Sequence, residues 1–302
     1  ASVIKVSVGK TPPEASDLAQ QAARTYAAAM RLLCLLLAGA MFTSCTSTVL
    51  NEPIVHASPY LALYQLRGDT SLQSTTGQPG APQDNDSVSM DTFGHGRSRE
   101  DVGLRLDVGD GFGGLRADYY KLDMDTSRSG VLANDWGQLR AGESVNLFAE
   151  MDELRLGYVE PLLDARTDWR DEELRLRLGA GGVLAIRDMN LRARETSNTR
   201  RQSVTFRGDV AYLALRAHAA WQDVELDLDY AIAPESFAFG GDIEGVAQDL
   251  EARVSYRLPQ GDMRFFAGYR LSEFSATADV DGLLAQSDLE INGLQLGFTV
   301  TF

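Results

Sequence analysis

Cysteine is scarce in this sequence of 302 residues, and so are long apolar runs and positive charge. There are two cysteines, too few for a disulfide-rich scaffold. The longest apolar run, residues 32–42, is shorter than the roughly 20 residues that a membrane-spanning helix needs. Acidic residues outnumber basic ones by 43 to 28, giving a formal charge of −15. Because phosphate binding needs a basic surface, nucleic acid is excluded as the expected partner.

The apolar run has the flanks of an export signal. A positively charged start precedes it and small residues follow, which predicts a secretory signal peptide over 30–44. Residues 1–29 are then an upstream extension or a mis-assigned start. Two cleavage sites fit: "FTSC" predicts lipid attachment at Cys45, and Ala38-Gly39-Ala40 predicts ordinary cleavage. Either one removes Cys34, so no intrachain disulfide is expected.

From about residue 58, apolar and polar residues alternate with the period of a β-strand. In "DVGLRLDV", for example, Leu104 and Leu106 fall on one face and Arg105 and Asp107 on the other. Ten such strands are predicted, at about 58–68, 100–109, 112–124, 145–159, 172–190, 203–219, 222–233, 247–258, 262–275 and 287–302.

Short and long connections alternate between these segments. Short turns are predicted at 109–112, 221–223 and 259–262, with a middling one at 161–171, and long polar loops at 69–99, 125–144, 191–202, 234–246 and 276–286. An up-and-down barrel that crosses a membrane keeps its short turns at one end and its long loops at the other. An even number of strands also brings both chain ends to the short-turn side.

Alternation alone does not say which face of the sheet meets lipid. The segments reach the 9–11 residues, roughly, that a tilted strand needs to cross a bilayer. Aromatic residues lie near the ends of the apolar faces, as in an interfacial girdle, at Tyr60, Tyr158, Tyr230, Tyr256 and Phe302. The sequence therefore predicts an all-β protein: an up-and-down antiparallel transmembrane β-barrel of about ten strands, or of 8 or 12, over 58–302. Residues 45–57 form a leader before it.

The last segment, "LQLGFTVTF", ends in phenylalanine and places Leu296, Phe298, Val300 and Phe302 on one face. In this, the chain from Cys45 onward resembles the outer-membrane β-barrel proteins of Gram-negative bacteria. Their last strand commonly ends in an aromatic residue that serves as an assembly signal. The resemblance implies a place in the bacterial outer membrane, with outer-membrane lipid and lipopolysaccharide as partners and the barrel assembly machinery as a partner during biogenesis.

If the apolar face meets lipid, the polar face lines the barrel, and arginines and carboxylates dominate it. Buried charges must be paired, so we expect a network that fills the lumen; the alternative is a narrow charged pore. The predicted members are Arg105, Asp107, Arg116, Asp118, Arg155, Arg175, Arg177, Arg207, Asp209, Glu225, Asp227, Asp229, Glu251, Arg253, Arg257, Arg264 and Arg270.

The sequence gives little support for catalysis, a cofactor or a metal. The three histidines, His56, His95 and His218, are not grouped with a nucleophile. "GDGFGG", residues 109–114, satisfies G-x-G-x-x-G, but a strand follows it, so it predicts a tight turn. The acidic stretch 277–288 lacks the first acidic ligand and the final glutamate of a calcium loop. We therefore expect no enzyme, no cofactor and no metal site.

The predicted role is structural or one of surface interaction, with the loops 69–99 and 125–144 presented outside to a partner that the sequence does not identify. Two alternatives stay open. One is a small porin-like channel for ions or small solutes. The other is a soluble periplasmic barrel that binds lipid, with its apolar face inward.

Overall fold

The structure is a computed structural model, which describes residues 53–74, 87–90, 100–125, 129–197, 200–234, 238–241, 246–259, 262–280 and 283–302. The predicted extension 1–29, the signal peptide 30–44 and Cys45 lie outside the described residues. Among those that are described, no helix is long and apolar enough to cross a membrane.

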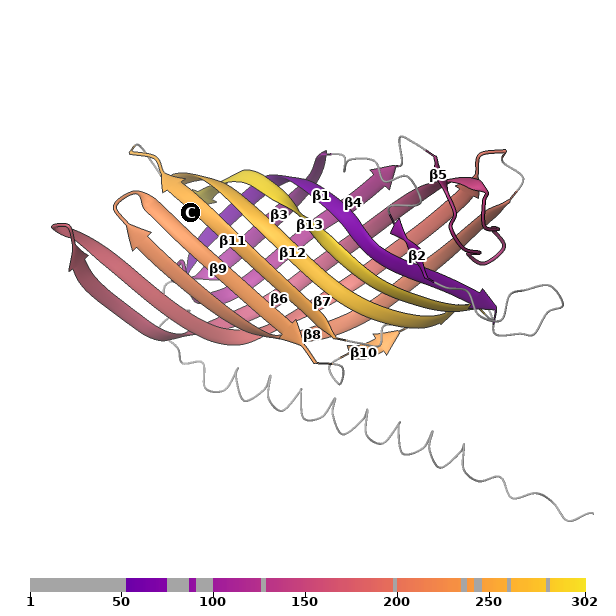
Figure 1. Cartoon of the computed structure of the whole chain (residues 1–302). Helices are drawn as coiled ribbons and strands as arrows, with labels where there is room; N and C mark the ends of the chain where they lie inside the picture. Colours follow the sequence, from indigo (N-terminus) through magenta and orange to yellow (C-terminus); the bar gives the residue numbers. More distant parts are fainter. Residues whose placement is uncertain are drawn as a thin grey trace, which may run out of the picture. The chain divides into compact units, whose positions relative to one another are not determined.

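All the strands of the described residues belong to one antiparallel sheet (Figure 1). Ten of them pair in chain order, and β13 returns to pair with β1, so the sheet closes on itself. The ring consists of β1 (Ile54–Ser74), β3 (Glu100–Gly109), β4 (Gly114–Asp125), β6 (Ser144–Trp169), β7 (Glu172–Glu195), β8 (Arg201–Trp221), β9 (Val224–Ala233), β11 (Ala247–Arg257), β12 (Met263–Val280) and β13 (Leu283–Thr301). Three short strands pair outside the ring: β2 (Val88–Ser89) with β1, β5 (Gly130–Val131) with β6, and β10 (Ala238–Gly241) with β8.

The register gives the tilt of the strands. Ile54 pairs with Gly109, and following the paired residues once around the ring leads back to β1 at Leu66. The displacement is 66 − 54, or 12 residues. With strand spacings of about 4.8 Å and a rise of about 3.3 Å per residue, ten strands then tilt by roughly 40° to the barrel axis. This tilt is typical of transmembrane barrels.

Tight connections gather at one end of the ring, which we call the short-turn end. Arg170 and Asp171 join β6 to β7 with φ of 57° and 64°, as in a type I′ hairpin turn. Gln222 and Asp223 join β8 to β9, and the β3–β4 turn occupies residues 110–113. The start of β1 and the end of β13 lie here too, where the Phe302 amide donates to the carbonyl of Val55 over 2.9 Å.

The predicted segments all overlap ring strands, but three predicted connections are mostly strand. Residues 161–169 continue β6, and most of 191–202 and 276–286 lies in the paired strands β7, β8, β12 and β13. These stretches resemble loops because their outward side chains are polar. They are strands because the neighbouring strands extend equally far and supply hydrogen-bond partners for their backbone.

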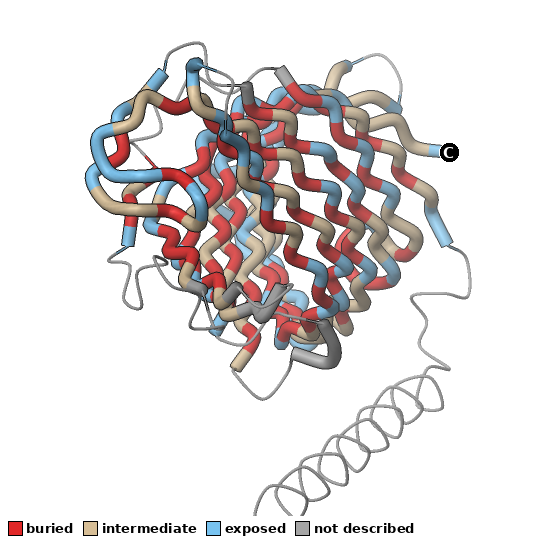
Figure 2. The backbone as a smooth tube through the Cα atoms, turned by 90° about the vertical axis from the view of Figure 1, so that its right-hand side faces the viewer, coloured by how far each residue is buried: buried red, intermediate tan, exposed pale blue. Residues whose placement is uncertain are grey.

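In the middle of the barrel, apolar side chains point outward and charged ones inward, and Figure 2 shows this alternation of burial along the strands. Leu104 is 44% exposed, whereas the adjacent Arg105 is 2% exposed. The outward apolar belt includes Leu61, Leu63, Val102, Leu104, Leu106, Leu115, Leu156, Leu184, Leu213, Leu215, Leu226, Leu228, Val254, Phe265, Leu294, Leu296 and Phe298. The fold is therefore a ten-stranded transmembrane β-barrel whose outer face is apolar at this level.

The predicted aromatic girdle is only partly outward. Tyr256 and Phe302 are exposed at the short-turn end, but Tyr60 is 3% exposed and points into the barrel. Its hydroxyl donates to Asp118 Oδ1 over 2.9 Å, so the charged interior determines its orientation. The prediction of an outward Tyr60 is wrong for this reason.

Toward the long-loop end, the polarity of the two faces is reversed. Along β6, Leu147, Ala149 and Met151 are buried inside, whereas Glu150 and Asp152 point outward. The same reversal occurs on β13, where Leu289 and Ile291 are inside. The barrel thus has a charge layer at the level of the apolar belt and an apolar layer beyond it. The described side chains that line the interior are therefore charged in the charge layer, as predicted, but mostly apolar in the apolar layer.

The connection between β4 and β6 covers the apolar layer. Trp136 and Leu139 are fully buried, and they exchange backbone hydrogen bonds of 2.9 and 3.0 Å with one another. The Gly137 amide donates to the carbonyl of Leu72 on β1 over 3.1 Å, and Leu132 and Met90 pack into the same apolar cluster. We call Leu132, Trp136 and Leu139 the cap.

The β6–β7 hairpin projects beyond the other short turns (Figure 1). Pairing of β6 with β4 ends at Val159, so the last ten residues of β6 have β7 as their only partner among the described strands. A bulge at Leu162 shifts the register. At the tip, the rings of Trp169 and Trp221, the hairpin tryptophans, lie 5.0 Å apart, and Arg170 lies over Trp169.

Candidate functional site: the charge layer

The part of the charge layer nearest the long-loop end is centred on Glu153 of β6, which is fully buried. Its carboxylate receives hydrogen bonds from Arg187 Nε over 2.6 Å and from Arg270 Nη2 over 3.0 Å. Arg155 Nη1 lies 3.8 Å away and itself pairs with Asp249 over 2.6 Å. Three arginines from three strands therefore share these two carboxylates, and Arg270 also lies 3.8 Å from a third, Asp118, so that the buried charges are paired across two clusters.

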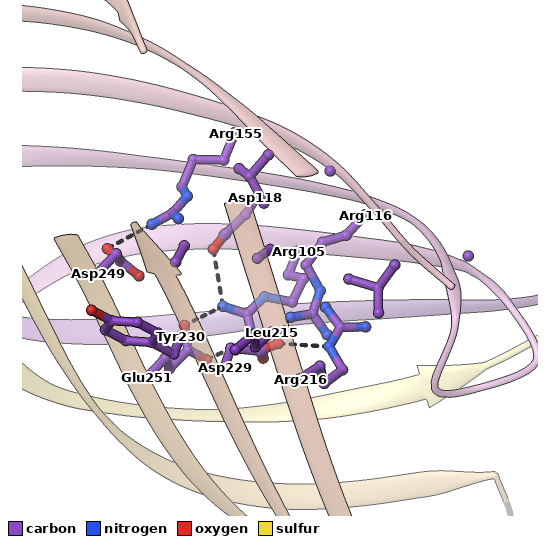
Figure 3. Close-up of a pocket in the computed structure, with 16 residues that line it drawn as sticks. Arg105, Arg116, Asp118, Arg155, Leu215, Arg216, Asp229, Tyr230, Asp249 and Glu251 are labelled. Atoms are coloured by element: carbon purple, nitrogen blue, oxygen red, sulfur yellow. Dashed lines mark hydrogen bonds and ion pairs between the residues drawn. The ribbon is translucent and has the colours of Figure 1, made fainter. Parts of the chain in front are cut away.

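A second cluster lies beside it, around Arg105 of β3. Its guanidinium donates two hydrogen bonds of 2.7 Å to the two carboxylate oxygens of Glu251 on β11. A third, of 2.9 Å, goes to Asp118 Oδ2. The bidentate contact crosses the barrel interior, because β3 and β11 are not neighbours in the ring. Figure 3 shows these side chains converging from opposite walls.

Nearer the short-turn end, the carboxylate of Asp229 lies between Arg116, at 2.8 Å, and Arg216, at 2.6 Å. Its neighbour on the same face of β9, Asp227, contacts Arg253 at 3.0 Å and His218 at 2.8 Å.

Glu225, the next carboxylate on the same face of β9, contacts Arg257 and Arg264, each at 2.7 Å. Arg116 also contacts Asp107 at 2.5 Å. Alternate residues of one strand thus supply carboxylates at three successive heights.

The β3–β4 turn folds into the short-turn mouth. Phe112 is 3% exposed, and the guanidinium of Arg177 stacks on its ring at 4.5 Å. Arg216 donates to the Phe112 carbonyl over 2.6 Å. The Asp110 carboxylate accepts from the amides of Phe112 and Gly113 and also pairs with Arg177. The glycine-rich sequence allows this inward turn, since Gly111 and Gly114 adopt φ of 85° and 119°.

Small cavities lie in the charge layer among the residues that the structure describes. One, of about 50 Å³, is lined by Arg105, Asp118 and Arg155 among others (Figure 3). Another, of about 30 Å³, lies at the mouth between His56, Ser58 and Arg264. Because one water needs roughly 10–15 Å³ of such space, each cavity has room for a few waters. Arg105 Nε has no hydrogen-bond partner among the described residues, and a water in the first cavity would satisfy it.

The structure places most of the predicted network residues in the interior. Arg105, Asp107, Arg116, Asp118, Arg155, Arg177, Glu225, Asp227, Asp229, Glu251, Arg253, Arg264 and Arg270 lie in the layer or at its mouth. Arg257 and Arg175 lie at the short-turn edge, paired with Glu225 and Asp164.

Two predicted members, Arg207 and Asp209, lie on the outer surface. The Arg207 side chain is 74% exposed and pairs with Asp188 over 2.8 Å. Both residues belong to the part of β8 where polarity is reversed, and this is why the prediction is wrong for them. Sequence reasoning also missed Glu153, Arg187, Arg216 and Asp249. Counting every second residue along a strand would have found them, because alternate residues share a face. Glu153 shares a face with Arg155, Arg187 with Arg177, Arg216 with His218, and Asp249 with Glu251.

The residues predicted as an assembly signal lie on the outer face of β13. Leu296 and Phe298 are 53% and 38% exposed as part of the apolar belt, and Phe302 is 78% exposed. Of the histidines, His56 and His218 lie at the short-turn mouth, and His95 is outside the described residues. In the described part of the chain, no group of three or more His, Cys, Asp or Glu residues could hold a metal ion.

No protein-family model and no curated protein sequence matches the chain. Among solved structures, it is similar to the outer-membrane protease OmpT from Escherichia coli, at 12% identity and a TM-score of 0.46 over 82% of this chain and 97% of that one. It is also similar to Ail, the attachment invasion locus protein of Yersinia pestis, at 9% identity and a TM-score of 0.29 over 82% and 98%. Neisserial surface protein A gives 10% identity and a TM-score of 0.28 over 83% and 97%.

Proposed function

We propose that this protein is an integral outer-membrane β-barrel with a closed lumen, whose role is structural or one of surface interaction. The observation that carries the proposal is the layered interior. Paired charges fill the barrel at the level of the apolar belt, and apolar side chains fill it beyond that level. A hydrated pore needs a continuous polar path, and the apolar layer interrupts it.

The two ends of the interior support the same conclusion. Phe112 occupies the short-turn mouth, held by Arg177, Arg216 and Asp110. The cap, with Trp136 fully buried, covers the long-loop end. In this proposal, the short-turn end faces the periplasm and the long-loop end faces outside, as in other transmembrane barrels. The part of the barrel with reversed polarity then stands outside the membrane as a rigid extension with a charged surface.

Catalysis is not part of the proposal. The His218–Asp227 pair resembles part of a catalytic group, but Asp227 also holds Arg253, and the pair lies beside Phe112 at the closed mouth. We take it as a member of the charge layer. The assembly role of Leu296, Phe298, Val300 and Phe302 stays a prediction that rests on the resemblance of the last strand.

Single-channel recording tests the closed lumen. The full chain is refolded in detergent, shown to be folded by its heat-modifiable migration on gels, and inserted into planar bilayers. We expect no stepwise current. Stepwise currents whose ion selectivity changes in the Arg105→Gln variant would instead support the small channel, since Arg105 lies at the centre of the charge layer. Extraction from membranes without detergent would contradict both and favour a soluble barrel.

A further inference from the structure

Two arginines lie directly opposite one another on the outer surface of the barrel. Arg194 of β7 and Arg201 of β8 are cross-strand partners, and both are exposed. Like charges at directly opposed positions destabilise strand pairing, so sheet stability does not explain this choice of residues. Neither arginine has a carboxylate partner among the described residues.

The other arginines nearby are different. Arg192 pairs with Glu150, Arg207 pairs with Asp188, and Arg200 lies 2.6 Å from Glu143. A chain with a formal charge of −15 has carboxylates in excess. Leaving two adjacent guanidinium groups unneutralised here is therefore a local exception, and it provides up to ten N–H donors, about five from each guanidinium, for an external anion.

The surroundings of this pair contain hydroxyl and amide groups, and Phe148 of β6 lies opposite Arg192. Asn146 of β6 is the cross-strand partner of Arg194 on its other side, and Ser203 pairs with Arg192. Arg192 lies two residues from Arg194 on the same face of β7. We call Asn146, Arg192, Arg194, Arg201 and Ser203 the arginine patch. Guanidinium groups at such spacing suit the oxygens of phosphate or carboxylate groups.

The height of the patch narrows the choice of anion. On β8, Leu213 and Leu215 belong to the apolar belt, and Asp209 is an exposed polar residue just beyond it. Arg201 lies eight residues further along the strand (209 − 201). At a rise of about 3.3 Å and a tilt of roughly 40°, this places it roughly 20 Å beyond the edge of the belt. The headgroup zone of a bilayer leaflet is only about 5–8 Å thick.

The phosphates of an ordinary phospholipid therefore lie too low to reach Arg194 and Arg201. A lipid with anionic groups on an extended sugar headgroup reaches this height. Since the patch faces sideways from the barrel wall, such a lipid would stand beside the barrel with its sugars against β7 and β8. We propose that the arginine patch binds the phosphate groups on the core sugars of lipopolysaccharide. This inference rests on the proposed location in the outer membrane.

The test measures the affinity of the folded full chain, in detergent, for lipopolysaccharide with a phosphorylated core and for the same glycolipid without core phosphates. The key variant is Arg201→Glu, which places a carboxylate opposite Arg194. Because this exchanges a repulsive cross-strand pair for an attractive one, the variant should fold at least as well as the parent. Its loss of binding would therefore not be a loss of structure.

We expect Arg201→Glu to weaken binding to the phosphorylated core by about tenfold or more, as expected for losing charge-assisted hydrogen bonds. Binding to the core without phosphates should be equally weak for the parent and the variant. Arg170→Gln is the matched control, because Arg170 has no carboxylate partner among the described residues and lies at the opposite end of the barrel. It should bind as the parent does.

Unchanged affinity of Arg201→Glu would overturn the inference. So would binding of inorganic phosphate to the parent as tight as that of the glycolipid, because the ligand would then be a soluble anion. Failure of the proposed closed lumen is separate, since it would be seen as currents in planar bilayers whether or not the arginine patch binds.

Discussion

Replacing Glu153 by glutamine tests whether the charge layer is a tightly paired network that water screens little. Glu153 is fully buried and receives hydrogen bonds from Arg187 and Arg270. Glutamine keeps the shape of the side chain and removes its charge. Arg270 and Arg155 would keep Asp249 as a partner, at 3.0 and 2.6 Å. Arg187 would keep no carboxylate among the described residues, only the ring of Phe274 at 4.2 Å.

The expected cost follows from this imbalance. Removing one partner of a buried ion pair leaves an uncompensated charge and typically costs about 3–5 kcal/mol. The matched control is Asp188→Asn, since the Asp188–Arg207 pair joins equivalent groups on the exposed outer wall. An exposed pair contributes at most about 1 kcal/mol. The two variants should therefore differ by at least about 2 kcal/mol.

Equilibrium unfolding in urea, in lipid vesicles, measures both free energies through tryptophan emission and heat-modifiable migration. A third variant, Glu153→Gln with Arg187→Met, removes the uncompensated charge and should recover part of the loss, because an apolar replacement of a buried pair is often neutral. If Glu153→Gln costs no more than Asp188→Asn, water screens the interior. The lumen would then be hydrated, and the proposal of a closed barrel would lose its main support.

Three further outcomes are expected. The pKa of Asp135 is lowered, chiefly by the hydrogen bond from the Ala141 amide, so this contact stabilises the loop near neutral pH and is lost as pH falls through the lowered pKa. The protection of the Ala141 amide, which is its intrinsic exchange rate at each pH divided by its measured rate, should fall in acid, and this fall should be absent in Asp135→Asn. Phe112→Ala should cost about 3–5 kcal/mol in urea unfolding yet leave planar bilayers silent, because the apolar layer persists; a current would refute this. In Trp136→Phe, the hairpin tryptophans should be quenched by lipids brominated near the headgroup, and unquenched emission would place the hairpin away from the bilayer.

Much of the barrel could be predicted from the sequence, because the alternation of side chains is a local property. "DVGLRLDV" alternates with period two wherever it lies, and the turn residues around Gly111 and Gln222 mark the strand ends. Pairing adjacent segments in chain order then requires only short connections. The same local signal identified most arginines and carboxylates of the charge layer, because they share a face with one another along each strand.

The sequence alone did not determine where the two faces exchange polarity. Arg207 and Arg177 both alternate with apolar residues, but one is exposed and the other is inside. The difference arises from their height relative to the bilayer. That height depends on the tilt of the strands, and the tilt depends on the register shift of 12 residues, from 54 to 66, around the ring. No single segment of the sequence contains this shift.

The partners of each charge were likewise decided by the closed ring. Arg105 meets Glu251 across 146 residues of sequence because β3 and β11 face one another through the interior. Arg194 and Arg201 are opposed because the β7–β8 register aligns them. Composition and alternation thus determined that this chain forms a membrane barrel with charges on one face. Only the tertiary structure decided which charges of the described residues neutralise one another and at which height apolar side chains replace them in the interior.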